Sequence, residues 1–295
     1  MSKENTSDFS ELTRDYFLGN YQSSINRAIS SPEEDDSILY LCLSYCGLHK
    51  YDNALHETSS SSEYYMNYIK LYIQCLKKER DQSSVINESG LRGLNSDTPP
   101  GKQRRREVFL EALIYVHFRL YTRAITLLDG QLMSHEPLVG FVLPLYYIGI
   151  QALIQINRLD LAEKWFNRMQ NIDALSSLTT LTKAQLKLVT NNPRETFEII
   201  SDLLDASNKP TPLLKNIQTA AAICFGDYEG AKQLCEESLD MDNDNPEALI
   251  NIVHILTKLR SSSDIRERHL GRLITLHPEH DFVKDFKRLT DELKA

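Results

Sequence analysis

A short pattern recurs along this 295-residue chain, and its recurrence constrains the fold more than any other feature. In each occurrence an aromatic residue or a leucine stands at a turn, and a small residue follows three positions later. The five occurrences, each given as its turn residue and its small residue, are Tyr21 and Ser24, Tyr51 and Ala54, Tyr121 and Ala124, Leu159 and Ala162, and Tyr228 and Ala231. The turn residues are 30, 70, 38 and 69 residues apart. Divided into six steps, these intervals average 34.5 residues, which predicts two degenerate repeats inside the two long intervals.

A period near 34 residues is typical of the tetratricopeptide repeat, in which each repeat is a pair of antiparallel helices. The small residue lets the second helix lie close to the first, and the turn residue fills the gap between neighbouring pairs. Apolar residues at helical spacing precede the turns, as Leu145, Ile148 and Ala152 do before Leu159. We therefore predict an all-α fold, a right-handed α–α superhelix of about seven to eight tetratricopeptide-like helix pairs with a C-terminal capping helix. The residues assigned to repeat packing are Tyr21, Tyr51, Ala54, Tyr121, Ala124, Leu159, Ala162, Tyr228 and Ala231.

The degenerate repeats have definite expected positions. One should turn near residues 81–84 and the other at 192–194, where Thr196 would occupy the small position. A last repeat should turn at 260–263 and place Ile265 in that position. An ordinary helical bundle with accidental spacing is the alternative, and the agreement of several repeats with one period favours the repeat.

The predicted organisation is a single solenoid over residues 1–295, preceded by a flexible N-terminus over 1–8. Residues 81–106 match the repeat least and contain a serine-rich stretch, a Pro-Pro-Gly sequence and the basic run 102–106. We interpret this segment as a partly mobile inter-repeat loop, with a nuclear localisation patch as the less favoured interpretation of the basic run. Residues 281–295 are predicted to form the capping helix, because four apolar residues share one face. These residues are Phe282, Phe286, Leu289 and Leu293.

The charge balance argues against nucleic acid as the main partner. The chain has 33 Lys and Arg against 41 Asp and Glu, for a net charge of −8, whereas neutralising phosphates requires a basic surface. The five cysteines are an odd and sparse set, which indicates reduced thiols in a cytosolic protein and not a disulfide framework. The opening residues 1–8 contain no apolar stretch, so no secretory signal is expected.

One segment has to be weighed as a membrane span, since residues 137–157 carry no charge over 21 positions. The segment contains Pro137, Pro144, Gln151 and Asn157, however, and a repeat helix accounts for its apolar stripe. We therefore expect no integral membrane segment.

The sequence lacks the common catalytic motifs. It contains no Gly-x-x-x-x-Gly-Lys-Ser/Thr phosphate loop, no Gly-x-Ser-x-Gly elbow and no His-Glu-x-x-His. Cys42, Cys46 and His49 share one helical face, as zinc ligands would, but no second ligand pair lies nearby in the sequence. Packing positions in the first helix of a repeat explain these residues better. An enzyme on a helical scaffold remains an alternative, against which stands the missing set of nucleophile, base and orienting group.

Two other groups of polar residues imitate binding sites. The run from Asp240 to Asp244 resembles the start of a calcium loop, but its sixth position is Asn245 and its twelfth is Asn251, where glycine and glutamate are required. An inter-repeat turn with helix-capping acids fits the run better. Three histidines near the C-terminus are interpreted as solvent-facing or capping residues: His269, His277 and His280. We predict no catalytic residue, no cofactor and no metal site.

A solenoid of this kind lines its inner surface with first-helix residues and offers a groove to another polypeptide. The predicted groove is apolar and aromatic, which suits a partner with apolar anchors, and its tyrosines add hydrogen-bonding tips. Some of these residues could instead belong to the core between helices. The predicted partner-binding groove consists of Leu39, Leu43, Tyr65, Tyr68, Tyr72, Phe109, Leu113, Tyr147 and Gln151.

Several runs of the sequence resemble the epsilon subunit of coatomer (ε-COP). The most specific is the run 158–170, Arg-Leu-Asp-Leu-Ala-Glu-Lys-Trp-Phe-Asn-Arg-Met-Gln. Further runs that resemble the family are 16–21, 178–181, 226–231, 245–251 and 280–286. The resemblance covers nearly the whole chain, is strongest from about residue 145 onward, and is weakest across 60–106, where the basic run departs from the family.

The resemblance implies a non-catalytic structural subunit of the COPI vesicle coat that binds the C-terminal region of the alpha subunit. Retrograde Golgi-to-ER and intra-Golgi transport would be its setting, with a location in the cytoplasm and, through the coat, peripherally on Golgi membranes and COPI-coated vesicles. A soluble tetratricopeptide adaptor or co-chaperone with transient partners is the alternative that the fold and the acidic charge allow.

Overall fold

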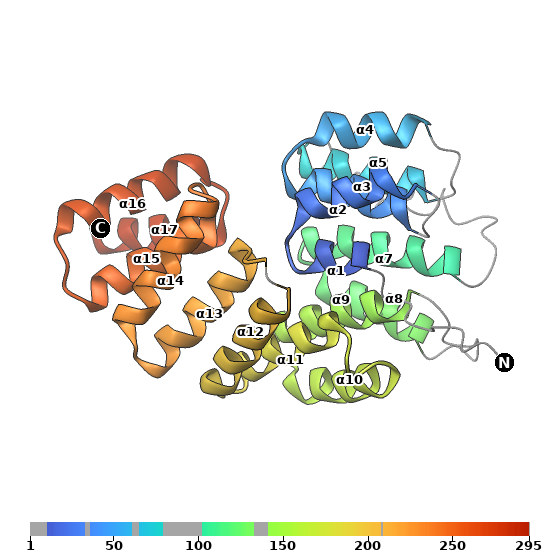
Figure 1. The fold of residues 1–295 in the computed structure, drawn as a ribbon. Coiled ribbons are helices and arrows are strands. Elements are labelled where there is room, and N and C mark those ends of the chain that lie inside the picture. Colours follow the sequence, from blue (N-terminus) through green and yellow to red (C-terminus); the bar gives the residue numbers. More distant parts are fainter. Residues whose placement is uncertain are drawn as a thin grey trace. The chain divides into compact units, whose positions relative to one another are not determined.

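The computed structural model describes residues 11–32, 36–60, 65–78, 102–132, 141–207 and 209–294 of the chain. In these ranges every regular element is an α-helix (Figure 1). The helices are α1 (Glu11–Phe17), α2 (Tyr21–Ser30), α3 (Ser37–Gly47), α4 (Tyr51–Ser60), α5 (Met66–Leu76), α7 (Lys102–His117), α8 (Tyr121–Leu132), α9 (Val142–Gln155), α10 (Leu159–Ile172), α11 (Ser177–Val189), α12 (Pro193–Ser207), α13 (Pro212–Phe225), α14 (Tyr228–Met241), α15 (Pro246–Lys258), α16 (Ser263–Leu276) and α17 (Asp281–Lys294). The predicted fold class is confirmed.

The contacts between helices follow a repeat. Most consecutive helices pack together, as α7 does with α8 and α13 with α14, and several odd-numbered helices also contact the next odd-numbered helix. Thus α1 contacts α3, α3 contacts α5, α7 contacts α9, and α13 contacts α15. Stacked helix pairs place the first helix of one pair beside the first helix of the next. The odd-numbered helices that make these contacts are therefore the first helices of tetratricopeptide-like pairs, and the described even-numbered helices that follow them are the second helices.

The chain divides into two compact units, residues 1–186 and 187–295, and the single solenoid over residues 1–295 remains a prediction. The hydrophobic core of the first unit is one cluster that runs from Leu12 in α1 to α11. The second unit has smaller clusters, one around Ala231 and one around Leu273. Because each helix pair in a repeat protein contacts only its neighbours, the buried core is built locally and can be interrupted.

The second helices begin at the turn residues of the sequence pattern. Tyr21, Tyr51, Tyr121, Leu159 and Tyr228 are the first residues of α2, α4, α8, α10 and α14. The small residues three positions later are completely buried: Ser24, Ala54, Ala124, Ala162 and Ala231. The degenerate repeat expected at 192–194 is also present, since α12 begins at Pro193 and Thr196 is completely buried. The turn expected near 81–84 lies outside the described residues, as do residues 1–8.

Local sequence signals place the helix ends of the second unit. Thr211, Asp227 and Asn245 are N-caps whose side chains accept a hydrogen bond from a backbone N–H in the first turn of α13, α14 and α15. Proline occupies the first position of α13 and of α15, where an N–H group would have no hydrogen-bond acceptor within the helix. Gly226 ends α13 in the left-handed conformation, with a φ of 88°.

We predict that Ala231→Leu destabilises the second unit by about 1–3 kcal/mol, because the extra methylene groups overpack a completely buried helix contact. Ala231 belongs to the cluster that also contains Ala222, Ala248 and Ile252, so three helices close around it. Urea unfolding followed by circular dichroism measures the effect. The matched control is Ala206→Leu on the exposed side of α12, which should leave the transition unchanged. Equal transitions for the two variants would contradict the repeat register.

The helix predicted over 281–295 is observed as α17. Its Val283 is completely buried against Leu249 of α15 and Leu273 of α16. Other apolar residues of α17 stay accessible, and Leu289 and Leu293 are 50% and 89% exposed. The residue of α17 that joins this cluster is therefore Val283, which is not one of the four residues of the predicted apolar face, and the capping role of that face remains a prediction.

The prediction of a loop up to residue 106 is wrong for its basic end. Residues 102–106 are the first residues of α7, and the side chains of Arg105 and Arg106 are buried. Arg106 forms an ion pair with Asp36, and its guanidinium lies 5.5 Å from the ring centre of Tyr65. Charged residues are buried when partners compensate them, and neither of these partners is close in sequence. Residues 79–101 lie outside the described part of the chain.

The placement of Ile265 in a buried small position is also wrong. Helix α16 begins at Ser263, as the last predicted turn requires, but Ile265 is 46% exposed. By analogy with Ala231, the third position after the start of α16 is Arg266, which is half-buried. A long charged side chain cannot enter the space that alanine fills, so this helix packs differently from the earlier second helices.

Candidate partner-binding surface

The structure separates the predicted groove residues into two groups. Five of them belong to the closed core of the first unit, with exposed fractions of 3% or less: Leu39, Leu43, Tyr65, Tyr68 and Phe109. Their assignment to an open groove is corrected. The physical reason is that a first helix packs both against its own second helix and against neighbouring first helices, so most of its circumference is covered. The other four are half-buried: Tyr72 in α5, Leu113 in α7, and Tyr147 and Gln151 in α9.

Tyr72 and Tyr147, two of these half-buried residues, lie close to aromatic residues of the first repeat. The ring centres of Tyr16 and Tyr21 are 5.8 Å apart, and the ring of Tyr147 lies 5.3 Å from that of Phe17. Burial raises the pKa of Tyr16 and of Tyr72, and in both cases neighbouring tyrosine hydroxyls raise it further. Tyr21 is one of these neighbours for Tyr16, Tyr72 and Tyr147, so the four side chains belong to one neighbourhood. We call Tyr16, Tyr21, Tyr72 and Tyr147 the tyrosine cluster.

Tyr21 is held in place by a close approach to α3. A Cβ atom added at Gly47, the last residue of α3, would lie 2.7 Å from Cζ of Tyr21. Glycine at this position therefore lets the Tyr21 ring lie directly against the backbone. Tyr21 is the first residue of α2 and stays partly accessible, so part of the residue lies at the surface beside the turn between α1 and α2.

Amide groups extend the tyrosine cluster along α9. Gln151 Nε2 donates a hydrogen bond to Oε1 of Gln185, at 2.6 Å. Burial raises the pKa of Tyr147, while its hydrogen bond with Gln185 lowers it. Gln185 of α11 therefore forms hydrogen bonds with both predicted groove residues of α9, Tyr147 and Gln151. The surface offers aromatic area together with neutral donors and acceptors.

The chemistry of this surface suits a polypeptide partner. With pKa values raised by burial, the phenols of Tyr16, Tyr72 and Tyr147 stay protonated and uncharged at neutral pH. Tyrosine combines a large apolar ring with a hydroxyl that pairs with backbone groups, and it is common among residues that dominate binding energies. Sequence reasoning missed Tyr16 and treated Tyr21 as packing alone, although the close spacing of these two aromatics was a signal.

The residues considered as metal ligands have other environments. Cys42 and Cys46 are buried, and burial raises the pKa of the Cys46 thiol to about 12, so it is protonated at neutral pH. His49 Nδ1 lies 2.9 Å from the hydroxyl of Tyr51. Within the described residues, no cluster of three or more His, Cys, Asp or Glu is arranged to hold a metal ion.

The run that resembles a calcium loop is an inter-repeat turn. Asp242 accepts a hydrogen bond from the backbone N–H of Asp244, and Asn245 caps α15. His277 Nε2 lies 2.6 Å from the backbone oxygen of Asp244, and His280 Nδ1 accepts a hydrogen bond from the backbone N–H of Phe282 at the start of α17. These polar residues therefore serve helix ends and the contacts between repeats.

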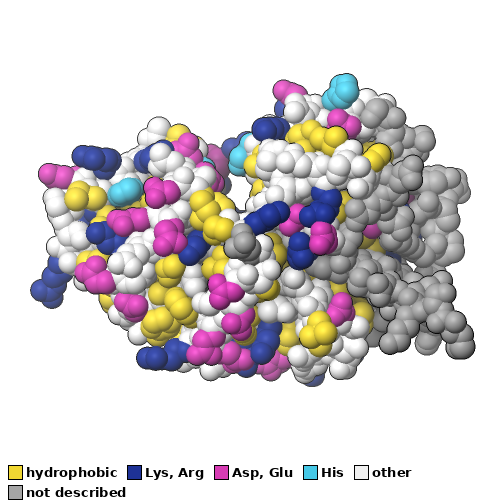
Figure 2. All heavy atoms as spheres, in the orientation of Figure 1, with side chains coloured by type: hydrophobic (Ala, Val, Ile, Leu, Met, Phe, Trp, Pro, Cys, Tyr) yellow, Lys and Arg dark blue, Asp and Glu magenta, His cyan; other side chains and the backbone are white. Residues whose placement is uncertain are grey.

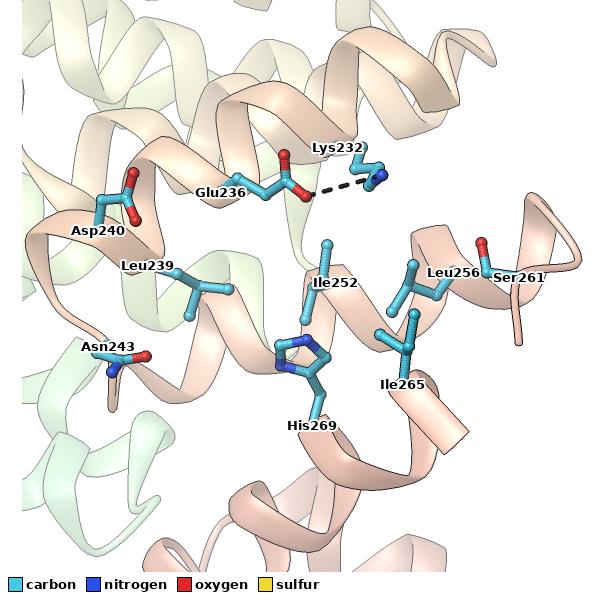
Figure 3. Close-up of a pocket in the computed structure, with 10 residues that line it drawn as sticks. All are labelled: Lys232, Glu236, Leu239, Asp240, Asn243, Ile252, Leu256, Ser261, Ile265 and His269. Atoms are coloured by element: carbon cyan, nitrogen blue, oxygen red, sulfur yellow. Dashed lines mark ion pairs between the residues drawn. The ribbon is translucent and has the colours of Figure 1, made fainter. Parts of the chain in front are cut away.

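The second unit contains a pocket of about 480 Å³ between α14, α15 and α16 (Figure 3). Leu239 of α14, Ile252 and Leu256 of α15, and Ile265 of α16 supply its apolar lining. Polar side chains of α14 and His269 of α16 surround the apolar residues. No residue of this pocket belongs to the predicted groove. The sequence signal for the pocket was Arg266, which stands in α16 at the position where the repeat has a small residue.

Basic and acidic side chains are interspersed over the visible face of the molecule, with hydrophobic side chains between them (Figure 2). The presence of both signs is expected for a chain with 33 basic and 41 acidic residues, whose net charge is −8. Among the helices described by the structure, none has both the length and the apolar character needed to cross a bilayer. The described part of the uncharged segment 137–157 includes α9, most of whose residues are buried in the core of the first unit.

Helix pairs, buried small residues and first-helix contacts define a tetratricopeptide-like repeat scaffold. The solved structure of a tetratricopeptide repeat protein from Parabacteroides merdae shares this fold, with a TM-score of 0.61 and 14% identity over 92% of this chain and 98% of that one. A chain of the APC/C hetero-tetramer Cut9–Hcn1 also matches, with a TM-score of 0.52 and 11% identity over 95% of this chain and 46% of that one. At such identities the likeness concerns the fold alone.

The sequence comparisons define the family. Residues 6–294 match the family model described as coatomer epsilon subunit. Coatomer subunit epsilon-2 of Arabidopsis thaliana is 27% identical over 96% of this chain and 93% of its own length. Coatomer subunit epsilon of Dictyostelium discoideum is 28% identical over 91% of this chain and 90% of its own length. The chain therefore belongs to the coatomer epsilon subunit family: it is a structural subunit of a vesicle coat, it is not an enzyme, and its partner is the coat complex.

Proposed function

We propose that this chain binds the C-terminal region of the coatomer alpha subunit and thereby supports retrograde Golgi-to-ER and intra-Golgi transport. In this role it acts in the cytoplasm and, through the coat, peripherally on Golgi membranes and COPI-coated vesicles. The observation that carries the proposal is the tyrosine cluster of the first unit, which combines partial exposure with aromatic rings packed at 5.8 Å between Tyr16 and Tyr21 and at 5.3 Å between Tyr147 and Phe17. Family membership supports the coat, and the cluster supports the direct contact with a polypeptide.

The tyrosine cluster suits a stable partner better than a transient one. Its four rings are partly covered already, so little side-chain freedom is lost when a partner covers the remainder. Their hydroxyls and the amide groups of Gln151 and Gln185 are neutral, so binding depends on apolar burial and hydrogen bonds and only weakly on salt. The affinity of a transient acidic adaptor would fall steeply as salt rises.

We expect Tyr72→Ala to weaken binding to a C-terminal fragment of the coatomer alpha subunit by about 10-fold to 100-fold, since central tyrosines contribute about 2 kcal/mol or more. Isothermal titration calorimetry with the purified fragment, at two salt concentrations, measures the change. Tyr147→Ala should act in the same direction because it removes the ring that contacts Phe17.

The control is Ile29→Ala, which removes a 60% exposed apolar residue from the second helix α2. This variant should bind as the unaltered chain does, and circular dichroism should show equal helix content for all variants. Unchanged affinity of both tyrosine variants, or an affinity that falls steeply with salt, would refute the proposed contact.

A further inference from the structure

The pocket in the second unit results from the departure of α16 from the repeat. Ser263 is the first residue of α16, as Tyr228 is of α14, so Arg266 stands at the position of Ala231. Helix α14 buries Ala231, Cys235 and Ser238 completely, whereas Leu273 is the buried residue of α16. The N-terminal half of α16 therefore lacks the small contact that draws a second helix onto its first helix. The pocket opens beside this half, at Ile265.

Polar contacts lie beside the pocket. Arg272 of α16 donates hydrogen bonds to Asn243, at 2.7 Å, and to Asp244, at 3.1 Å from its Nε. His277 contacts the backbone oxygen of Asp244 at 2.6 Å. These contacts tie the turn after α14 to α16 beside the pocket, which lies between α14, α15 and α16.

The α14 side of the pocket is acidic. Glu236 and Asp240 lie one turn apart on this helix, and both are exposed. Lys232 forms an ion pair with Glu236 at 3.8 Å, whereas Asp240 has no ion pair among the described residues. On the opposite side, burial and the neighbouring Arg272 and Arg268 lower the pKa of His269, against the smaller raising effect of Glu236. His269 is therefore mainly neutral at neutral pH, and the carboxylates give the pocket its charge.

We propose that this pocket binds a helical segment of a partner protein that places one large apolar side chain over Ile252 and Ile265 and a lysine or arginine against Asp240. Complementarity with the unpaired carboxylate selects a cationic residue. The apolar lining of the pocket favours a large apolar side chain of the partner. A helix presents this side chain and the cationic one on the same face when they are three or four positions apart.

Other occupants fit the pocket less well. The acidic α14 side repels the anionic headgroups that attract peripheral proteins to membranes. A second copy of this chain could offer its own α17, and the dependence of the methyl signals on the concentration of the chain separates this occupant from a peptide. The site lies in the second unit, whereas the tyrosine cluster lies in the first, so its occupant need not be the partner of the tyrosine cluster.

Two stapled helical peptides of alanine background test the proposal. Both carry one central phenylalanine; four positions later the first has lysine and the second has glutamate. Each is titrated into the full chain with isotope-labelled isoleucine and leucine methyl groups, and the methyl signals are followed by NMR. We expect the lysine peptide to shift the Ile252 and Ile265 methyls and to bind at least about 10-fold more tightly than the glutamate peptide.

Two variants localise the effect. Asp240→Asn should reduce the preference for the lysine peptide to about 3-fold or less, and Ile265→Glu should abolish binding of both peptides. Ile265 is 46% exposed, so the second substitution leaves the core intact. Both variants should bind the alpha-subunit fragment with unchanged affinity, which separates a failure here from a failure of the proposed function.

Three results would overturn the proposal. They are the absence of shifts at Ile252 and Ile265 with the lysine peptide, equal affinity of the two peptides, and methyl shifts that follow the concentration of the chain alone. The last result would identify a second copy as the occupant.

Discussion

Gly149→Val is expected to destabilise the first unit by about 3–5 kcal/mol. Gly149 lies in α9, where a Cβ atom would stand only 2.1 Å from Cζ3 of Trp165 in α10. No real structure contains such a contact, so α9 and α10 must separate or Trp165 must leave its buried site. Trp165 is 5% exposed and is the only tryptophan of the chain, so its fluorescence follows the unfolding of this unit in urea directly.

The matched control is Gly130→Ala in α8, where a Cβ atom meets nothing within 4 Å. Alanine loses less conformational entropy than glycine when a helix forms, so this variant should be more stable by about 0.5–1 kcal/mol. A second test adds Trp165→Ala to Gly149→Val, which should cost less than the sum of the two single changes, as measured by circular dichroism. A Gly149→Val chain with an unchanged midpoint would show that the indole does not occupy this position.

Arg106→Leu is expected to cost about 3–5 kcal/mol in the free energy of unfolding, because it removes the guanidinium that pairs with the largely buried Asp36 carboxylate. The two side chains are each 10% exposed, and Arg106 also lies over the ring of Tyr65. The pair joins the start of α3 to α7, so its loss affects the interior of the first unit. Chemical denaturation followed by tryptophan fluorescence measures the change.

The exposed pair of Arg158 and Asp160 provides the control, since its atoms are 2.9 Å apart but more than half of each side chain is accessible. Arg158→Leu should leave the unfolding midpoint close to that of the unaltered chain, because solvent screens exposed ion pairs. Asp36→Asn in the Arg106→Leu background should restore part of the loss by removing the charge of that carboxylate. No difference between Arg106→Leu and Arg158→Leu would argue against a buried pair.

The repeat arithmetic predicted the fold because it depends on contacts that every repeat shares. A buried small residue three positions into the second helix is a local requirement, and Ala54, Ala124, Ala162 and Ala231 all meet it. The same arithmetic located the degenerate repeat at Thr196. It failed at Ile265, where the expected small position was assigned to the wrong residue of α16.

The partner-binding surface was predicted only in part, and the reason is geometric. Helical spacing identifies the apolar residues of a first helix but does not say which of them face a neighbouring helix and which remain accessible. Tyr68 is in the core and Tyr72, one turn later, is half-buried, although both fit the same stripe. The role of Arg106 could not be predicted either, because its partner Asp36 lies 70 positions earlier in the chain.

The division of the hydrophobic core also bears on how this sequence can change. The cluster around Leu12 and the cluster around Ala231 have no residue in common, so substitutions in one are expected to add nearly independently to substitutions in the other. Selection on the tyrosines of residues 1–186 is then largely independent of selection on the pocket in residues 187–295. The two proposed contacts are therefore expected to change independently of each other in evolution.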